Sequence, residues 1–80
     1  MKNIVGARIR EARLQAQTPL SQEELAARLQ AKGVEIDQTA ISRIESGDRQ
    51  VTDVELLAVC QALGIAVESL FVGLRLPQDK

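Results

Sequence analysis

The sequence predicts a single all-α domain, a compact bundle of five short helices. Three observations lead to this fold class. Apolar residues recur at helical spacing along most of the chain. Helix-capping residues and glycines stand where such segments begin and end. No alternating apolar pattern is longer than Val34-Glu35-Ile36, so no strand is expected.

The composition limits both the core and the chemistry. Of the 80 residues, 45% are hydrophobic and only Phe71 is aromatic, so the core must be aliphatic. There is no histidine, and the one cysteine, Cys60, is expected to be buried and inert. The chain also lacks a phosphate loop and a plausible nucleophile–base pair. We therefore expect no enzyme activity, no metal and no cofactor.

The first predicted helix spans residues 4–17, with Val5 and Ile9 on its apolar face. Thr18-Pro19 should end it, because the residue before proline avoids helical backbone angles. A second helix should follow at a capping box formed by Ser21 and Glu24. Its expected core residues are Leu25, Ala26 and Leu29, and Gly33 should close it.

The third predicted helix runs from residue 38 to about residue 46, with Asp37 as N-cap and Gly47 after its end. Thr52 and Glu55 form a second capping box, which opens a fourth helix that Gly64 closes. The apolar positions of this fourth helix are Leu56, Leu57, Val59, Cys60 and Leu63. A short fifth helix over residues 67–71 completes a domain of residues 1–72. Residues 73–80 are expected to form a frayed tail.

The third helix carries a polar stripe. At about 100° per residue, its hydrogen-bonding side chains fall on one side and its apolar residues on the other. The stripe consists of Gln38, Thr39, Ser42 and Arg43. Glutamine reads adenine bidentately, arginine reads guanine, and serine or threonine serves several bases. This pattern is typical of a recognition helix, but the same residue types are common on ordinary solvated surfaces, so the helix alone leaves both interpretations open.

The residues around the second helix favour the interpretation of the third helix as a recognition helix. Gln22 lies in its first turn, where unsatisfied N–H groups and the helix dipole attract a phosphate, and its amide would also brace Gln38. Residues 1–32 carry six basic and three acidic side chains, although the whole chain has a formal net charge of −1. A polyanion would therefore be attracted mainly by the first helix and the start of the second.

Four stretches of the chain, in this order, resemble the Cro/phage-repressor type of helix-turn-helix, also called XRE-like. They are residues 6–13, 20–26, 41–47 and 55–64, and the likeness covers residues 4–71. Each stretch is weakly specific by itself, and the four in this order are specific together. The resemblance implies a five-helix bundle of the phage repressor DNA-binding domain type, in which the second and third helices form an extended helix-turn-helix.

The resemblance also implies roles for individual residues. The implied DNA-binding residues are Gln22, Gln38, Thr39, Ser42, Arg43 and Ser46. Gln22 would contact one phosphate strand, and Ser46 with the backbone near Gly47 would meet the other. The remaining four would face base edges. Arg13 and Glu45 match a structural salt bridge between the first and third helices, so Arg13 is not assigned to DNA.

The turn between the second and third helices departs from the family pattern. Ala26 and the buried Ile41 stand fifteen positions apart, which corresponds to a five-residue insertion. We expect the second helix to run an extra turn and the chain to return through Val34 and Ile36. Lys32 would then approach the DNA backbone.

The expected function is that of a cytoplasmic, sequence-specific regulator that binds double-stranded DNA, and in particular of a repressor. The sequence does not separate a phage-type regulator from a restriction–modification controller or a DNA-binding antitoxin. The alternative is a protein-interaction module that keeps the fold and has lost DNA binding, which the acidic balance after residue 33 favours. No membrane and no small-molecule ligand is expected as a partner.

One recognition helix reads few base pairs, so we expect a homodimer on a pseudo-palindromic operator. The expected interface is C-terminal and apolar. It would consist of Val67, Leu70, Phe71, Val72, Leu74 and Leu76. The alternative is that Leu70 and Phe71 complete the core of the monomer.

Overall fold

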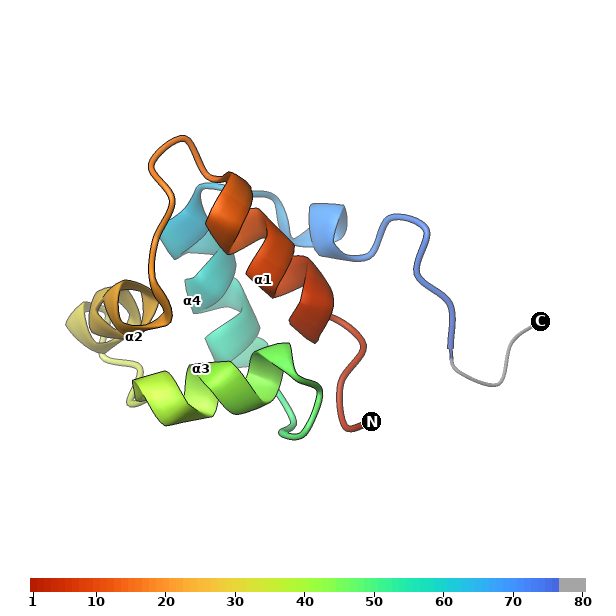
Figure 1. Cartoon of the computed structure of the whole chain (residues 1–80), viewed down its shortest axis with the longest axis horizontal. Coiled ribbons are helices and arrows are strands. Elements are labelled where there is room, and N and C mark those ends of the chain that lie inside the picture. The colour runs from red at the N-terminus through yellow and green to blue at the C-terminus, as the bar shows by residue number, and fades with distance from the viewer. Residues whose placement is uncertain (77–80) are drawn as a thin grey trace.

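The computed structural model describes residues 1–76 of the chain, and within them it contains helices and no strand (Figure 1). The four α-helices are α1 (Gly6–Gln15), α2 (Gln22–Ala31), α3 (Gln38–Glu45) and α4 (Asp53–Leu63). The all-α prediction is confirmed. Of the predicted C-terminal tail, residues 77–80 lie outside the described residues.

The prediction of five helices is wrong, because the last segment is a single 3-10 turn, η1 (Val67–Leu70). Its backbone closes the shorter hydrogen bonds of a 3-10 turn, from the Ser69 N–H to the Ala66 carbonyl and from the Phe71 N–H to the Glu68 carbonyl. Ala66 before it is extended. The segment is therefore too short to complete α-helical turns.

The first helix is shorter than predicted at both ends. Its N-cap residue, Val5, supplies no side-chain cap. The side-chain oxygen of Asn3 instead accepts hydrogen bonds from the Val5 and Gly6 N–H groups, at 3.0 and 2.7 Å. At the other end the backbone turns extended at Ala16, two residues before Thr18-Pro19.

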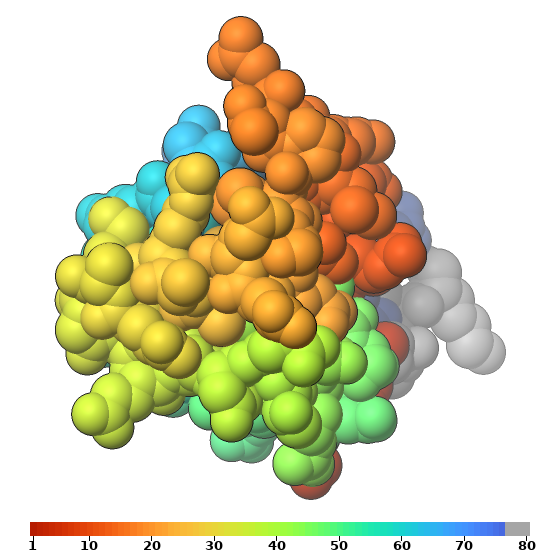
Figure 2. All heavy atoms as spheres, turned by 60° about the vertical axis from the view of Figure 1, so that its left-hand side comes forward, coloured from red at the N-terminus to blue at the C-terminus, as the bar shows by residue number. Residues whose placement is uncertain are grey.

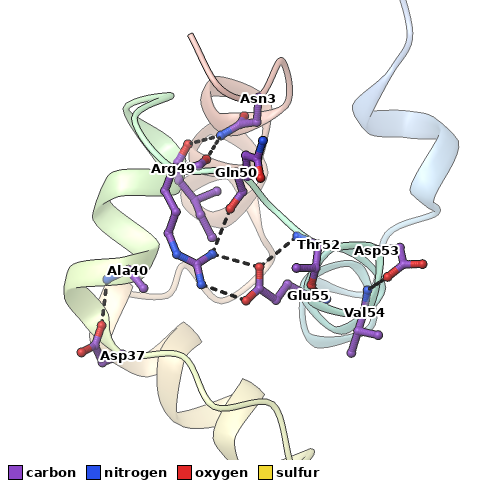
Figure 3. Close-up of polar contacts among 10 residues, drawn as sticks. Asn3, Asp37, Ala40, Arg49, Gln50, Thr52, Asp53, Val54 and Glu55 are labelled. Atoms are coloured by element: carbon purple, nitrogen blue, oxygen red, sulfur yellow. Dashed lines mark hydrogen bonds and ion pairs between the residues drawn. The ribbon is translucent and has the colours of Figure 1, made fainter.

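The predicted caps of the other helices are confirmed. Ser21 and Glu24 form a complete capping box at α2, and Thr52 and Glu55 form a second one at α4. The Asp37 side chain accepts a hydrogen bond from the Ala40 N–H at 2.8 Å, at the start of α3 (Figure 3). These caps bond groups within three residues of each other, which is why the sequence reveals them.

The core is aliphatic and is drawn from every helix. Its largest fully buried side chains are Ile9, Leu25, Leu29, Ile41, Ile44, Leu70, Val59 and Cys60. Burial raises the pKa of the Cys60 thiol, which keeps it protonated and unreactive near neutral pH. Leu57, one of the apolar positions expected in the fourth helix, is 51% exposed and lies outside this core.

The α1 and α2 helices both pack against α3 and α4, and α3 lies across the lower side of the molecule (Figure 1). Gly6 permits a close crossing of α1 over the end of α3, because a Cβ at this position would run into the carbonyl oxygen of Ile44. The approach fixes where the end of α3 lies relative to α1.

The turn between α2 and α3 folds back onto the helix that precedes it. The Val34 N–H donates to the Leu29 carbonyl, and the Gln30 side chain donates to the Ile36 carbonyl at 2.8 Å. Ile36 is buried, as the expected return path requires. Lys32 lines a shallow hollow with Leu57 of α4 and with Val34, and not the hollows that border Gln38 and Arg43 of α3. This position gives no support to its expected approach to the DNA backbone.

Two further structural findings concern the described part of the chain. No helix among residues 1–76 is long and apolar enough to cross a membrane. The same residues hold no group of histidine, cysteine, aspartate and glutamate side chains that could bind a metal ion.

Candidate nucleic-acid interface

The polar stripe of α3 faces outward. Gln38, Thr39 and Arg43 are exposed and Ser42 is half-buried, whereas Ile41 and Ile44 on the opposite side are almost completely buried. In the space-filling view, α2 and α3 meet in one continuous face (Figure 2). The residues predicted to face DNA bases therefore share a surface that solvent, or a ligand, can reach.

A buried ion pair lies beneath this surface. Arg13 of α1 donates from Nε to Glu45 Oε2 and from Nη2 to Glu45 Oε1, both at 2.8 Å. Its third nitrogen, Nη1, donates to the Leu20 carbonyl at 2.8 Å. These hydrogen bonds to Glu45 raise the pKa of Arg13 above its ordinary value. Arg13 is 94% buried, which keeps its side chain from a phosphate and agrees with a structural pair between α1 and α3.

Two glutamines extend this pair to the surface. The Gln22 side-chain nitrogen donates to Glu45 Oε1 at 3.0 Å, and its oxygen accepts from the Gln38 side-chain nitrogen at 2.7 Å. The chain of contacts thus runs from buried Arg13 through Glu45 and Gln22 to exposed Gln38. It links α1, α2 and α3, so the first residue of α3 is held by the core.

The hydrogen-bonding capacity that remains on Gln38 matches an adenine edge. A glutamine amide has two N–H donors and one carbonyl oxygen. Gln38 gives one N–H to Gln22 and keeps the other N–H together with its oxygen. A bidentate contact to adenine needs one donor and one acceptor, which is the pair that remains.

Gln22 likewise keeps one N–H donor after its contact with Glu45. It stands at the first position of α2, where the helix dipole favours an anion. The sequence had not assigned a role to Arg10, but this exposed residue of α1 lines the same shallow hollow as Gln22 and Gln38. Only the excess of basic residues before position 33 pointed to it.

The side chain of Ser46, at the end of α3, forms hydrogen bonds inside the protein. Its hydroxyl donates inward, to the Arg43 carbonyl at 3.1 Å and to the Asp48 carboxylate at 3.2 Å. The N–H groups of Ser46, Gly47 and Asp48 also donate to carbonyls of the helix. Ser46 is exposed at the predicted place, but its donors are already engaged.

A second polar cluster fixes the loop that follows α3 (Figure 3). Arg49 forms two parallel hydrogen bonds with Glu55, at 2.9 and 3.0 Å, and Glu55 also accepts from the Thr52 N–H. The bonds from Arg49 and Thr52 lower the pKa of Glu55 below its usual range. Asn3 donates from Nδ2 to the carbonyls of Ile44 and Arg49, at 3.0 and 2.8 Å. Sequence reasoning predicted the Thr52–Glu55 cap within this cluster but missed the contacts of Arg49 and Asn3, and Asn3 lies more than forty positions from its partners.

The family model of a helix-turn-helix domain matches residues 4–78 of this chain. The chain belongs to the helix-turn-helix domain family. This match agrees with the resemblance seen in the sequence, and the five-residue insertion in the turn stays a prediction. Comparison with curated proteins and with solved structures gave no match.

In this helix-turn-helix domain, α2 and α3 are the two helices that name the motif, joined by the turn of residues 32–37. Helix-turn-helix domains place their second helix in the major groove and read base edges from it. The membership therefore indicates DNA binding, and it gives a chemical meaning to the outward polar stripe of α3.

Proposed function

We propose that this helix-turn-helix domain is a sequence-specific regulator of transcription that binds double-stranded DNA and acts as a repressor. The observation that carries the proposal is the contact chain from Arg13 to Gln38, which holds the Gln38 amide on an exposed face with one donor and one acceptor left for a bidentate contact. Preorganisation lowers the entropic cost of ordering a side chain at an interface. Repression is the simplest consequence of such binding, since a domain in the major groove excludes other proteins from that stretch.

The proposed roles of the site residues follow from their positions. Gln38, Thr39, Ser42 and Arg43 read base edges from α3. Gln22 contacts a phosphate at the start of α2, with Arg10 beside it as a further phosphate contact. Phosphate contacts fix the register of the domain on the duplex, and base contacts supply its sequence preference.

We propose further that the regulator binds as a homodimer on a pseudo-palindromic operator, through a surface near the end of the domain at residue 72. Of the residues predicted for this interface, Leu70 is buried in the monomer core, whereas Phe71 and Val72 are 42% and 68% exposed. The contact with a second copy would therefore be made by exposed residues such as Phe71 and Val72, and not by Leu70. Two-fold symmetry would set the α3 helices of the two copies about 34–36 Å apart, one turn of DNA.

A protein-interaction module is the second candidate function. Val54 and Leu57, on the face of α4 beside Lys32, are 62% and 51% exposed. Exposed apolar side chains of neighbouring turns are typical of a protein contact. This function would leave the polar stripe of α3 without a role.

Selection of bound duplexes from a random pool, followed by titration of the winning duplex at several salt concentrations, separates the two candidates. A DNA-binding regulator enriches a defined site and binds it more weakly as salt rises, because phosphate contacts release counterions. A pool that stays random, with no salt-dependent binding, would support the protein-interaction module.

A further inference from the structure

Residues 1–3 fold back onto the end of α3. The Lys2 N–H donates to the Gly47 carbonyl at 2.8 Å, and the two Nδ2 hydrogens of Asn3 go to the Ile44 and Arg49 carbonyls. Figure 1 shows the N-terminus on the same side of the molecule as α3, and Figure 3 shows Asn3 above the loop that carries Arg49. The segment is thereby tied to both sides of the turn at Gly47.

Asn3 is fully engaged in this arrangement. Its oxygen accepts from the Val5 and Gly6 N–H groups, so the whole carboxamide joins the start of α1 to the last turn of α3. An amide has no further N–H donors to give. The backbone of Lys2, held on one side by Gly47 and followed on the other by Asn3, therefore has a defined place.

Lys2 lines a hollow in which basic residues outnumber acidic ones. The residue is exposed, and its neighbours around the hollow include Arg43 at the end of the polar stripe, Asp48 and Arg49. Within residues 1–76, the ion pairs are Arg13–Glu45 and Arg49–Glu55, and neither includes Lys2. The ammonium group of Lys2 is thus available to an outside anion.

At the end of α3, the other groups that could bind a phosphate are already engaged inside the protein. Its N–H donors and the Ser46 hydroxyl are used inside the protein, and Arg49 is held by Glu55. The exposed Asp48 carboxylate, close to Ser46, would repel a phosphate. Lys2 and Arg43 offset that charge, and Arg43 is proposed to read bases.

We propose that Lys2 contacts the DNA phosphate that lies beside the end of α3 when α3 occupies the major groove, and that Asn3 is the positioning residue that holds Lys2 there. This inference rests on the proposed function, because it assigns one more phosphate to the same DNA site. A lysine contacts phosphate as a point charge, so the contact stabilises binding without adding a sequence preference.

The test compares Lys2→Ala with Lys32→Ala, a matched control with the same loss of charge beside α4. Affinity for the selected duplex and for a scrambled duplex is measured across salt concentrations. Loss of one phosphate contact reduces the slope of log affinity against log salt by about 0.9, and weakens binding about fivefold near 0.15 M salt. We expect Lys2→Ala to show this change on both duplexes and Lys32→Ala to keep the wild-type slope.

Asn3→Ser tests the positioning role, since it leaves the charge of the protein unchanged. Serine keeps a cap acceptor for α1 but is too short to bridge to α3. We expect the salt slope of Asn3→Ser to fall toward that of Lys2→Ala, and the double variant to show no further loss. Circular dichroism at the binding temperature ensures that only folded protein is compared.

The outcomes separate the two levels of the proposal. If the wild-type protein binds with a salt-dependent affinity and Lys2→Ala keeps the wild-type slope, the Lys2 contact is wrong and the proposed function stands. If Lys2→Ala lowers the slope and Asn3→Ser does not, the positioning role of Asn3 is wrong. If the wild-type protein shows no salt-dependent binding to duplex DNA, both the proposed function and the Lys2 contact are overturned.

Discussion

At the scale of single residues, four side chains connect the core to the proposed DNA-reading surface. Arg13 and Glu45 are buried and form hydrogen bonds with each other. Gln22 donates a hydrogen bond to Glu45 and accepts one from Gln38, so it links Gln38 to the buried pair. A buried ion pair gives little net stability over an apolar pair, but removing one partner leaves an unpaired buried charge. Arg13 therefore matters to folding first and to DNA binding through the position of Gln22.

We predict that Arg13→Ala lowers the free energy of unfolding by about 3–5 kcal/mol, because Glu45 is left buried without its partner. Affinity of the folded fraction should fall much less. Denaturant titration and duplex titration of the same preparations measure the two effects. Arg10→Ala is the control on the same helix, and as an exposed residue it should change the unfolding free energy by less than about 0.5 kcal/mol. Normal stability with lost DNA binding in Arg13→Ala would instead make Arg13 a phosphate contact.

At the scale of the elements, the sequence predicts features that depend on spacings of a few residues, and it does not predict contacts between distant parts of the chain. The capping boxes at Ser21 and Thr52 and the polar stripe of α3 follow from spacings of a few residues, and the sequence predicts them. The approach of Gly6 to Ile44 and the bridge from Asn3 to Arg49 join residues about forty positions or more apart. No local pattern encodes such pairs, since they depend on how α1 crosses α3.

The same dependence on distant contacts explains where the structure differs from the sequence-based expectations. The apolar residues after Gly64 resemble a helix in sequence, yet the segment is too short to be more than a 3-10 turn. The phosphate contact that the family resemblance implies for Ser46 stays a prediction, and Asp48, two residues later, accepts a hydrogen bond from its hydroxyl. Leu57 fits the apolar pattern of α4 and still points to solvent. Composition and spacing do not determine these outcomes, because they depend on what lies opposite each side chain.

The cap of α4 makes stability depend on pH. In the folded protein the pKa of Glu55 is lowered by Arg49 and Thr52, whereas in the unfolded chain it is near 4.3. A lowered folded pKa stabilises the protein fully above about pH 4.3, and the contribution is lost as pH falls toward the folded pKa. We predict that Glu55→Gln is less stable at neutral pH and loses less stability than wild type between about pH 4.5 and pH 3.

Urea titrations at a series of pH values measure this difference. Glu24 also has a lowered pKa, through the Ser21 N–H, and its acid dependence remains in both proteins. The comparison of wild type with Glu55→Gln therefore isolates Glu55. Parallel pH profiles in the two proteins would mean that the Arg49 contact does not stabilise the ionised form.

At the scale of the whole molecule, a small domain with a formal net charge of −1 gains little from non-specific attraction to DNA. Its basic residues gather before position 33, and Arg10 and Lys2 place part of that charge at the two ends of the polar stripe. Two copies on one duplex would double the number of base and phosphate contacts. This is the physical reason for the proposed dimer.

We predict that sedimentation at rising concentration with the selected operator yields a complex of two chains per duplex. Phe71→Ser should weaken this assembly, because it removes exposed apolar area next to the core without opening the core itself. Val54→Ser is the control on the exposed face of α4. A complex of one chain per duplex at saturation would contradict the dimer.

Duplex selection with wild type and Gln38→Ala measures whether α3 reads base edges through Gln38 held by Gln22. We predict that Gln38→Ala lowers affinity for the selected site by about 1–3 kcal/mol and loses the preference at one base position, an adenine, in each half-site. Gln61→Ala, an exposed glutamine on α4, should leave the profile unchanged. The same base preference in wild type and Gln38→Ala would rule out base reading by Gln38.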